Sequence, residues 1–443
     1  MKINYSTKTI ISVVIGLIFL VSFSYAMYHQ IHPIVDSKAY NKIALNIIEG
    51  NGFREEVDQS FQFDRSIQRA GPAYEFFLAG VYSIFGYHFW IVWLLQSILL
   101  ASSSFLLYCI GRRIFPNTGA IIGIMAAILF GFHPDLVEIS AMIMTENFYL
   151  FLTVLTAYFF VRVYEKPDSL FFASLLGTFT AIGILSRPPI LLFVPIIVVF
   201  YFIKKKYAPI AVFLITCFAL LVPWTVRNYQ IYDQFIPTTL IGEYNIWVGN
   251  TLQADGGQLG GGYNPFNEHV ESKGFFSIRD AARDAFKIFL IEHPFEFIKL
   301  TAIRTIRFFS LIRPMGFWFY QTGLSQMAFV ISSALAIAVL FISGFSGMFA
   351  LLKKKSSIHK YLIAFALSAP VLLLVTVVQS RYRFQIYPFL ALFGAYFLYN
   401  AYKDFKSVKK YLWYSLAGLF LFSVIDILFF WDLIINRLES FFG

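Results

Sequence analysis

Long runs of apolar residues recur along this chain, separated by shorter polar segments. Many of them approach the roughly 20 residues that a helix needs to cross a bilayer. The apolar residues follow one another without alternation, which favours helices over a membrane barrel. The pattern predicts an all-α bundle of about eleven transmembrane helices, near residues 8–29, 89–111, 117–133, 147–163, 169–186, 189–203, 208–225, 329–352, 360–379, 385–402 and 412–433.

The composition is that of a membrane protein. Of the 443 residues, 58% are hydrophobic and 14% are charged, whereas soluble domains carry about 25% charged residues. A water-soluble core could not bury this much apolar surface, so we expect a lipid bilayer around most of the chain. Cys109 and Cys217 both lie in apolar runs and have neither disulfide nor zinc spacing, so we interpret them as small apolar residues.

Basic residues predict the orientation in the membrane. They gather in short loops: Arg112–Arg113, Arg162 with Lys166, Lys204–Lys206, Lys353–Lys355 with Lys360, and Lys403 with Lys406, Lys409 and Lys410. Loops rich in lysine and arginine face the cytoplasm, which explains the net charge of +10 without a nucleic-acid partner. We therefore expect a multi-pass protein of the cell (inner) membrane. Its N-terminus would be cytoplasmic and, because the number of spans is odd, its C-terminus would be extracytoplasmic.

Two long loops, 30–88 and 226–328, fall on the opposite, extracytoplasmic side. We interpret the chain as a single domain, 1–443, whose function resides on that side. The first loop contains two amphipathic or aromatic stretches, Ser37–Ile48 and Gly71–Phe85, which are typical of helices lying in the membrane interface. The second stretch could instead be a true span, which would invert all later loops, and the lysine clusters argue against that.

Acidic residues at the outer face are candidates for catalysis. Asp36 follows the first span, and Glu146 begins the fourth. A carboxylate at such a position can act as a general base, although either residue could simply stabilise the start of a helix. Asp135 and Glu138 lie in the same loop as Glu146. Together with Asp36 they could hold a divalent cation, magnesium or manganese, but no ligand spacing indicates a metal specifically.

Arginines also occur at the outer boundary of the membrane. Arg69, Arg187, Arg227, Arg381 and Arg383 all lie there, against the usual charge bias. Guanidinium groups bind phosphate with geometric specificity, whereas a single arginine can also reach up to lipid headgroups. Several converging arginines favour a phosphate site. Within the last span, Asp426 is an acid whose role the sequence leaves open.

Together these segments resemble the superfamily of protein O-mannosyltransferases and lipid A aminoarabinose transferases, which have the GT-C fold. The motifs are Asp36-Ser37 with Tyr40, Glu49-Gly50-Asn51-Gly52-Phe53, Arg69 before Gly71-Pro72-Ala73-Tyr74, Thr145-Glu146, Arg187-Pro188, Pro223-Trp224 before Arg227-Asn228, and Arg381-Tyr382-Arg383. The resemblance covers most of the chain. No single motif is specific, but their order and their placement against the spans are moderately specific together.

The resemblance implies an inverting glycosyltransferase. Such enzymes take a sugar from a polyprenyl-phosphate donor lipid and transfer it to a hydroxyl acceptor (a glycan, lipid or protein) at the extracytoplasmic face. By this resemblance, Asp36 would be the catalytic base and Glu146 a second catalytic acid. Donor phosphate would be bound by Arg69, Arg187, Arg381 and Arg383. Substrate would be bound by Tyr40, Tyr74, Arg227 and Asn228.

Some positions depart from the family pattern. The protein mannosyltransferases have an Asp-Glu pair where this chain has Asp36-Ser37, and the Pro-rich segment is degenerate at Ala70–Tyr74. These departures leave the sugar and the acceptor open. The main alternative is a polytopic transporter or lipid flippase, and a third is a membrane scaffold. Two long outer loops and few ionisable residues within the spans favour the enzyme.

Overall fold

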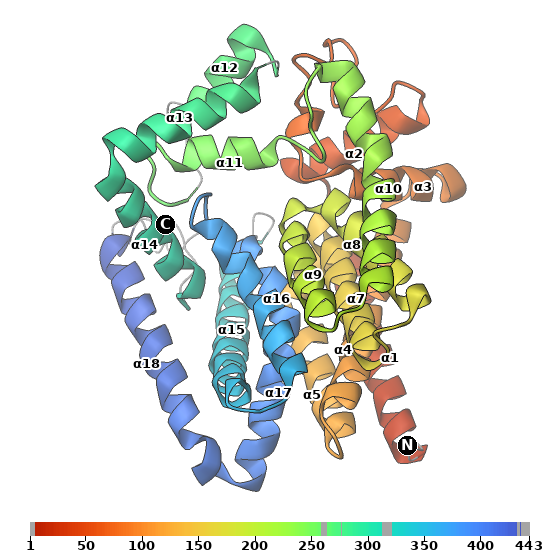
Figure 1. Cartoon of the computed structure of the whole chain (residues 1–443), viewed down its shortest axis with the longest axis vertical. Helices are drawn as coiled ribbons and strands as arrows, with labels where there is room; N and C mark the ends of the chain where they lie inside the picture. Colours follow the sequence, from red (N-terminus) through yellow and green to blue (C-terminus); the bar gives the residue numbers. More distant parts are fainter. Residues whose placement is uncertain (1–4, 258–263, 276, 312–320, 432–434, 436–443) are drawn as a thin grey trace.

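The computed structural model describes residues 5–257, 264–275, 277–311, 321–431 and 435, and these residues form a bundle of helices capped at one end (Figure 1). Each of the eleven predicted spans coincides with a helix. These helices are α1 (Tyr5–His29), α4 (Phe89–Ile114), α5 (Gly119–Gly131), α7 (Thr145–Glu165), α8 (Leu170–Ser186), α9 (Phe193–Ile203), α10 (Tyr207–Tyr232), α15 (Gly323–Leu352), α16 (Ser357–Leu373), α17 (Tyr387–Lys403) and α18 (Phe405–Phe429). The all-α membrane bundle predicted from the sequence is confirmed.

Some of these eleven helices are long and apolar enough to cross a membrane. Within the described residues, six helices are long and apolar enough to cross a bilayer, and a seventh results if α5 and the helix after it form one bent span. That helix, α6 (Pro134–Ala141), is inclined by 56° to α5. Shorter apolar helices cover 170–186, 188–203 and 357–372. The exact number of spans stays a prediction, and residues 432–433 of the last expected span lie outside the described residues.

The remaining helices surround one end of the bundle. They are α2 (Asp36–Ile48), α3 (Pro72–Phe85), α11 (Ile241–Gly249), α12 (Pro265–Lys273), α13 (Ile278–Glu292) and α14 (Pro294–Phe309), with 3₁₀ helices η1 (Arg65–Gln68), η2 (Pro188–Leu192) and η3 (Ser380–Ile386). Figure 1 shows α2 and α3 lying crosswise to the bundle, as interfacial helices do. With 14 residues, α3 is only about 21 Å long, which is too short to cross the bilayer. The division of the chain into loops 30–88 and 226–328 stays a prediction.

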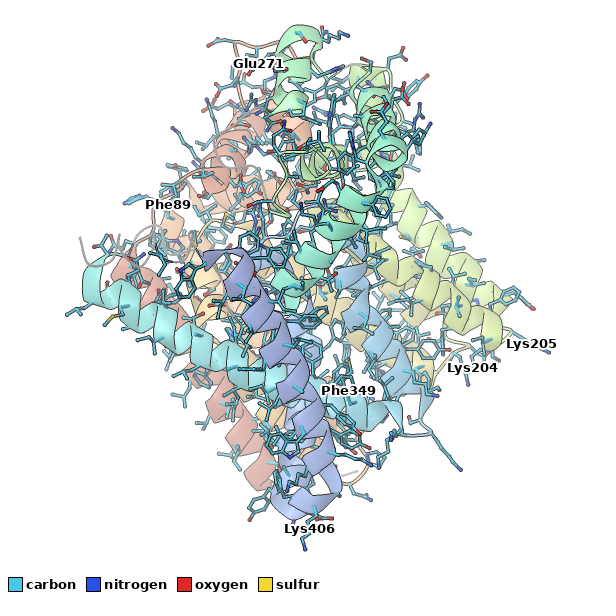
Figure 2. The ribbon with its side chains drawn as sticks, turned by 90° about the vertical axis from the view of Figure 1, so that its left-hand side faces the viewer. Phe89, Lys204, Lys205, Glu271, Phe349 and Lys406 are labelled. Carbon is cyan, nitrogen blue, oxygen red and sulfur yellow. The ribbon has the colours of Figure 1, made fainter. Side chains whose placement is uncertain are left out.

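The basic loops meet at the other end of the bundle. An ion pair of 2.9 Å joins Arg113 to Glu165, and the hydroxyl groups of Tyr164 and Ser357 are 2.6 Å apart. Figure 2 places Lys406 at one end of the molecule and Glu271 at the other. The bundle therefore separates its positively charged loops from the end that carries α2, α3 and the capping helices. This is the arrangement that the charge pattern predicts.

The capping helices have an apolar core of their own. Tyr232, Leu240, Val248, Phe266 and Phe275 are buried together against η1. Backbone hydrogen bonds join the two outer segments: the amide of Leu240 donates to the carbonyl of Ile67 (2.8 Å), and that of Phe275 to Gln62 (2.7 Å). We call the unit formed by η1 and α11–α13 the outer cap. Burial of its apolar residues holds the cap in a defined shape above the bundle.

Candidate active site

Asp36 is the first residue of α2, just after the chain turns out of α1. Val35 before it has a φ of 50°, which is rare for a β-branched residue. The buried Ser37 side chain closes the turn, because its hydroxyl donates to the carbonyl of Ile34 (2.6 Å) and accepts from the amide of Ile34 (2.7 Å). Ser37 therefore has a local structural task. Val35 caps α2 without a side-chain hydrogen bond, and the carboxylate of the next residue, Asp36, is contacted by arginines from other segments.

Three arginines and two acids form a connected chain of charges beside α2. Nη1 of Arg381 lies 2.8 Å from Asp36 Oδ2 and 3.5 Å from Glu146 Oε1. Arg187 contacts the same Glu146 oxygen at 2.7 Å, and Arg69 approaches Asp36 Oδ1 at 3.5 Å. These five residues come from α2, η1, α7, η3 and the α8–η2 junction. The fold thus brings together five of the residues that the sequence analysis selected.

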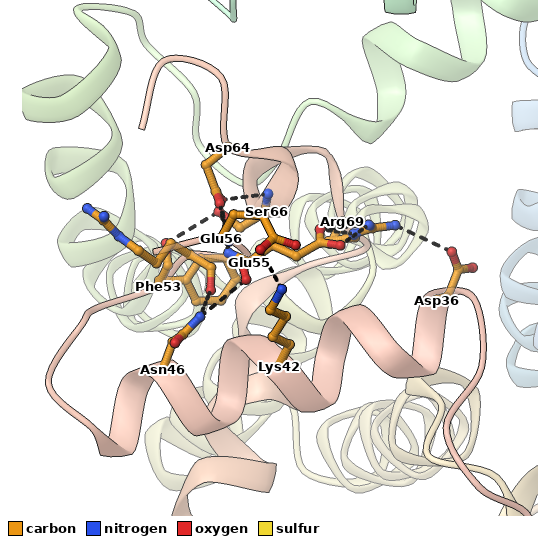
Figure 3. Close-up of polar contacts among 10 residues, drawn as sticks. Asp36, Lys42, Asn46, Phe53, Glu55, Glu56, Asp64, Ser66 and Arg69 are labelled. Atoms are coloured by element: carbon orange, nitrogen blue, oxygen red, sulfur yellow. Dashed lines mark hydrogen bonds and ion pairs between the residues drawn. The ribbon is translucent and has the colours of Figure 1, made fainter. Parts of the chain in front are cut away.

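Arg69 is oriented by a loop that the sequence analysis missed. Its guanidinium binds both oxygens of Glu55, at 2.6–3.0 Å, and Figure 3 shows Arg69 extending from Glu55 toward Asp36. The loop itself is folded around Asp64, whose carboxylate is fully buried. This carboxylate accepts hydrogen bonds from the backbone amides of Glu55, Glu56 and Ser66 at 2.7–3.1 Å. No spacing in the sequence marked Glu55 as a partner of Arg69.

Gly71 explains how Arg69 and Arg187 come close. A Cβ added at Gly71 would overlap the backbone carbonyl groups of Leu185 and Ser186. Only glycine therefore allows the start of α3 to pack directly on the end of α8. Because Arg69 lies two residues before Gly71 and Arg187 follows Ser186, this contact fixes the distance between the two guanidinium-bearing segments.

A cavity of about 370 Å³ opens beside these charges. Asp36, Tyr40, Arg69, Arg187 and Arg381 line it. Glu146 does not; it is 1% exposed and lies behind Arg187 and Arg381. Glu146 thus contacts the two arginines and not the cavity, and its expected catalytic role stays a prediction.

The electrostatics keep Asp36 ionised. Burial by itself raises the pKa of Asp36, but Arg381, Arg69 and Arg187 outweigh it and hold the pKa below its usual value. The pKa of Arg381 is raised despite burial, because Asp36 and Glu146 stabilise its positive charge. Burial also raises the pKa of Tyr40, with a further contribution from Asp36, so Tyr40 remains a neutral phenol. The three guanidiniums face the carboxylates of Asp36, Glu146 and Glu55.

Arg383 lies apart from this group. It is 2% exposed and donates to the backbone carbonyls of Ser310 (2.8 Å) and Arg307, at the end of α14. Residues two apart in a 3₁₀ helix point in different directions, because one turn takes three residues. Arg383 therefore does not line the cavity beside Arg381, and its expected role at the donor phosphate stays a prediction.

Three of the expected substrate-binding residues also lie outside the cavity. Tyr74 is fully buried and donates to the side-chain oxygen of Gln96 (2.8 Å). Arg227 donates to the carbonyl of Phe53 (3.0 Å), and Asn228 to that of Ile236 (2.9 Å). These contacts hold the first outer loop and the segment after α10 in place. Of the four, only Tyr40 lines the cavity.

Further cavity residues emerge only from the structure. Gln379 accepts from Nε of Arg381 at 2.6 Å, and the ring of Tyr382 lies 5.6 Å from the guanidinium carbon of Arg187. Tyr382 is the middle residue of the Arg381-Tyr382-Arg383 motif and Gln379 lies just before it, and that motif was the only sequence signal for either residue. Asp135 and Glu138 are buried in α6 and do not line this cavity. Within the described part of the chain, no group of three or more His, Cys, Asp or Glu side chains is arranged to hold a metal ion.

Comparison with known proteins identifies the fold. The family described as dolichyl-phosphate-mannose-protein mannosyltransferase matches residues 69–226. ArnT from Cupriavidus metallidurans, solved with undecaprenyl phosphate, is similar at a TM-score of 0.53 and 11% identity, covering 87% of this chain and 59% of that one. The apo oligosaccharyltransferase of Archaeoglobus fulgidus is similar at a TM-score of 0.55 and 13% identity. The match covers 95% of this chain and 56% of that one. The complex of that enzyme with an inhibitory peptide and a dolichol-phosphate is similar at a TM-score of 0.52 and 13% identity. The match covers 97% of this chain and 56% of that one.

This chain spans less than two thirds of the length of these solved structures. A search of curated protein sequences found no match. The matched structures have the helix arrangement known as GT-C. The expected fold is thereby confirmed: this chain is a polytopic membrane protein with the GT-C fold of membrane glycosyltransferases.

Proposed function

We propose that this protein transfers a sugar from a polyprenyl-phosphate donor to a hydroxyl acceptor, with inversion at the anomeric carbon. The observation that carries the proposal is the position of Asp36, an ionised carboxylate held between Arg381 and Arg69 on the wall of one cavity. A base and a set of phosphate-binding cations are what this reaction needs at neighbouring points. The relatives solved with undecaprenyl phosphate and with a dolichol-phosphate support a lipid-phosphate donor.

The reaction balances with these groups alone. The carboxylate of Asp36 accepts the proton of the acceptor hydroxyl, and the hydroxyl oxygen forms a bond to the anomeric carbon. The bond between that carbon and the phosphate oxygen breaks, and polyprenyl phosphate leaves with the electron pair. Arg69, Arg187 and Arg381 stabilise the charge that develops on the leaving phosphate. Glu146 keeps Arg187 and Arg381 in position from behind.

Donor binding would also activate the base. The donor phosphate competes with Asp36 for the guanidinium groups of Arg69 and Arg381. As these cations turn to the phosphate, they lower the pKa of Asp36 less, and the negative phosphate raises it further. Asp36 therefore becomes a stronger base only when a donor is present, which limits proton abstraction in the empty site.

The apolar side of the cavity fits a lipid donor. Ile34 and Val35 line it and are 39% and 77% exposed, in the segment that joins the membrane helix α1 to α2. A polyprenyl chain could remain in the bilayer while its phosphate reaches the arginines. The site favours the enzyme over the transporter, because Asp36, Glu146 and the three arginines gather around one cavity at the capped end of the described bundle.

We also propose the orientation predicted by charge. The basic end, which carries Lys406, would face the cytoplasm of a cell (inner) membrane, and the cavity would face the extracytoplasmic side. The N-terminus would be cytoplasmic and the C-terminus extracytoplasmic. A cysteine at exposed Asp58, labelled from outside intact cells by a membrane-impermeant thiol reagent, supports this orientation. Labelling at Lys406→Cys instead contradicts it.

A transfer assay tests the function. The purified full-length protein is incubated with a panel of polyprenyl-phosphate hexoses and pentoses, and loss of sugar from the lipid is measured with and without acceptor. Acceptor-dependent loss that disappears in Asp36→Asn supports the proposal, and no turnover of any donor contradicts it. The same assay with EDTA, and with magnesium or manganese restored, decides whether a divalent cation takes part.

A further inference from the structure

The cavity beside Asp36 has two chemically different walls. On the bundle side, apolar residues Ile34, Val35, Met142 and Met144 line it. On the opposite side, the outer cap supplies mainly polar residues: Arg65, Gln68, Tyr244, Asn245 and Asn267. We call this second surface the amide wall. The apolar wall suits the polyprenyl chain of the donor, so the amide wall is the surface available to the acceptor.

The amide wall offers hydrogen bonds that the described protein does not use. Among the described residues, the side-chain amides of Gln68, Asn245 and Asn267 have no hydrogen-bond partner. All three are partly exposed and line the cavity. Their backbones are fixed nonetheless, because they belong to η1, α11 and α12, which pack on the shared core of the outer cap. The wall therefore presents donors and acceptors at set positions.

The charge on this wall is low. Arg65 is its one basic residue, and it pairs with Glu271 at 3.8 Å on the exposed rim. A side-chain amide both donates and accepts hydrogen bonds, as does a hydroxyl group. Neighbouring hydroxyls on a ring therefore match a set of amides better than a lipid chain or an anion does. A cavity of about 370 Å³ is at the small end of ligand sites, which span about 300–1,000 Å³, and it fits a short saccharide.

We infer that the amide wall is the acceptor subsite and that it takes a neutral, hydroxyl-rich saccharide. The inference rests on the proposed function, since it names the acceptor of that same reaction. A saccharide bound to Asn245 and Asn267 lies in the same cavity as Asp36, so one of its hydroxyls can reach the carboxylate. Strand addition, one common mode of binding an extended peptide, is not offered by the described residues, which form no strand.

The test compares acceptors and then removes the amides. Full-length protein and a polyprenyl-phosphate sugar that it turns over are assayed with an oligosaccharide, a serine- and threonine-containing peptide, and a diacylglycerol. We expect transfer to the oligosaccharide. Asn245→Ala and Asn267→Ala should each raise the acceptor KM roughly three- to tenfold and leave the donor KM unchanged. Gln253→Ala is the matched control, because Gln253 is an exposed amide near the cap that does not line the cavity.

The outcomes separate the inference from the function beneath it. An unchanged acceptor KM in both variants overturns the acceptor subsite, and so does transfer to the peptide or the diacylglycerol but not to the oligosaccharide. In each of these cases the donor is still consumed, so the glycosyltransferase proposal stands. If no donor is consumed with any acceptor, the proposed function fails and the inference fails with it. Thermal unfolding of the variants confirms that they are folded.

Discussion

Arg381 lies 345 positions after Asp36 in the sequence, yet its Nη1 is 2.8 Å from Oδ2 of the Asp36 carboxylate. The same nitrogen is 3.5 Å from the buried carboxylate of Glu146. One guanidinium thus joins the first outer loop, the start of α7 and the segment before α17. A displacement of any of these three elements would therefore change the contact between Arg381 and Asp36.

Replacement of Asp36 by asparagine should abolish sugar transfer. The amide keeps the size of the carboxylate but cannot accept the hydroxyl proton, and loss of a general base costs about 100-fold or more in rate. The measurement is kcat for release of sugar from the donor lipid. Asp58→Asn is the control, since Asp58 is an exposed acid of the same loop. Near-normal turnover in Asp36→Asn would remove this residue as the base.

Replacement of Arg381 by alanine should weaken donor binding. A hydrogen bond to a charged group contributes about 1.5–3 kcal/mol, so we expect the donor KM to rise roughly 10- to 100-fold. Arg381→Lys should restore only part of the affinity, because lysine lacks the planar fork. Arg112→Ala, at the basic end of the bundle, should bind the donor normally. Equal donor affinity in Arg381→Ala and the unmodified protein would exclude a phosphate role.

The pH profile should report on the same pair. Because the pKa of Asp36 is held below its usual value, the carboxylate stays ionised as the pH falls. The acid limb of kcat/KM, which reports the free enzyme, should therefore lie below the pH range in which an ordinary aspartate titrates. Arg381→Gln removes the largest opposing cation, so the pKa rises and the limb should move to higher pH. A limb at the same pH in both proteins would mean that Asp36 does not govern it.

Glu146 should matter for stability more than for chemistry. It is 1% exposed and pairs with Arg187 at 2.7 Å. Removal of one member of a buried ion pair leaves the other charge uncompensated and costs about 3–5 kcal/mol. Glu146→Gln should therefore lower the Tm of the purified protein. The double variant with Arg187→Gln should regain part of the loss, and a double variant less stable than Glu146→Gln would argue against this pairing.

Arg383 should act through the geometry of η3. Its guanidinium binds carbonyls at the end of α14, where a cation is favoured by the helix dipole. Arg383→Ala should lower both the Tm and kcat, because η3 also carries Arg381. Arg383→Lys should recover part of each, since it keeps the positive charge. If Arg383→Ala raised only the donor KM and left the Tm intact, direct phosphate binding would be the better explanation.

The sequence by itself determined the helices of the membrane bundle. Apolar runs of sufficient length must be helical in lipid, because no water is present to satisfy the backbone. The amphipathic or aromatic patterns of Ser37–Ile48 and Gly71–Phe85 likewise predicted α2 and α3 to within one residue. The charge pattern also gathered the basic loops at one end. These features depend on local composition, which a sequence displays directly.

Only the tertiary structure decided which outer charges meet. Arg381 and Arg383 look equivalent in the sequence, but one reaches Asp36 and the other the end of α14. No sequence pattern indicated Glu55 as a partner of Arg69, because the loop around Asp64 is what directs Glu55 toward Arg69. Ion pairs and cavity walls depend on the direction of side chains from elements far apart in the chain. Packing of those elements sets the directions, and no local pattern records it.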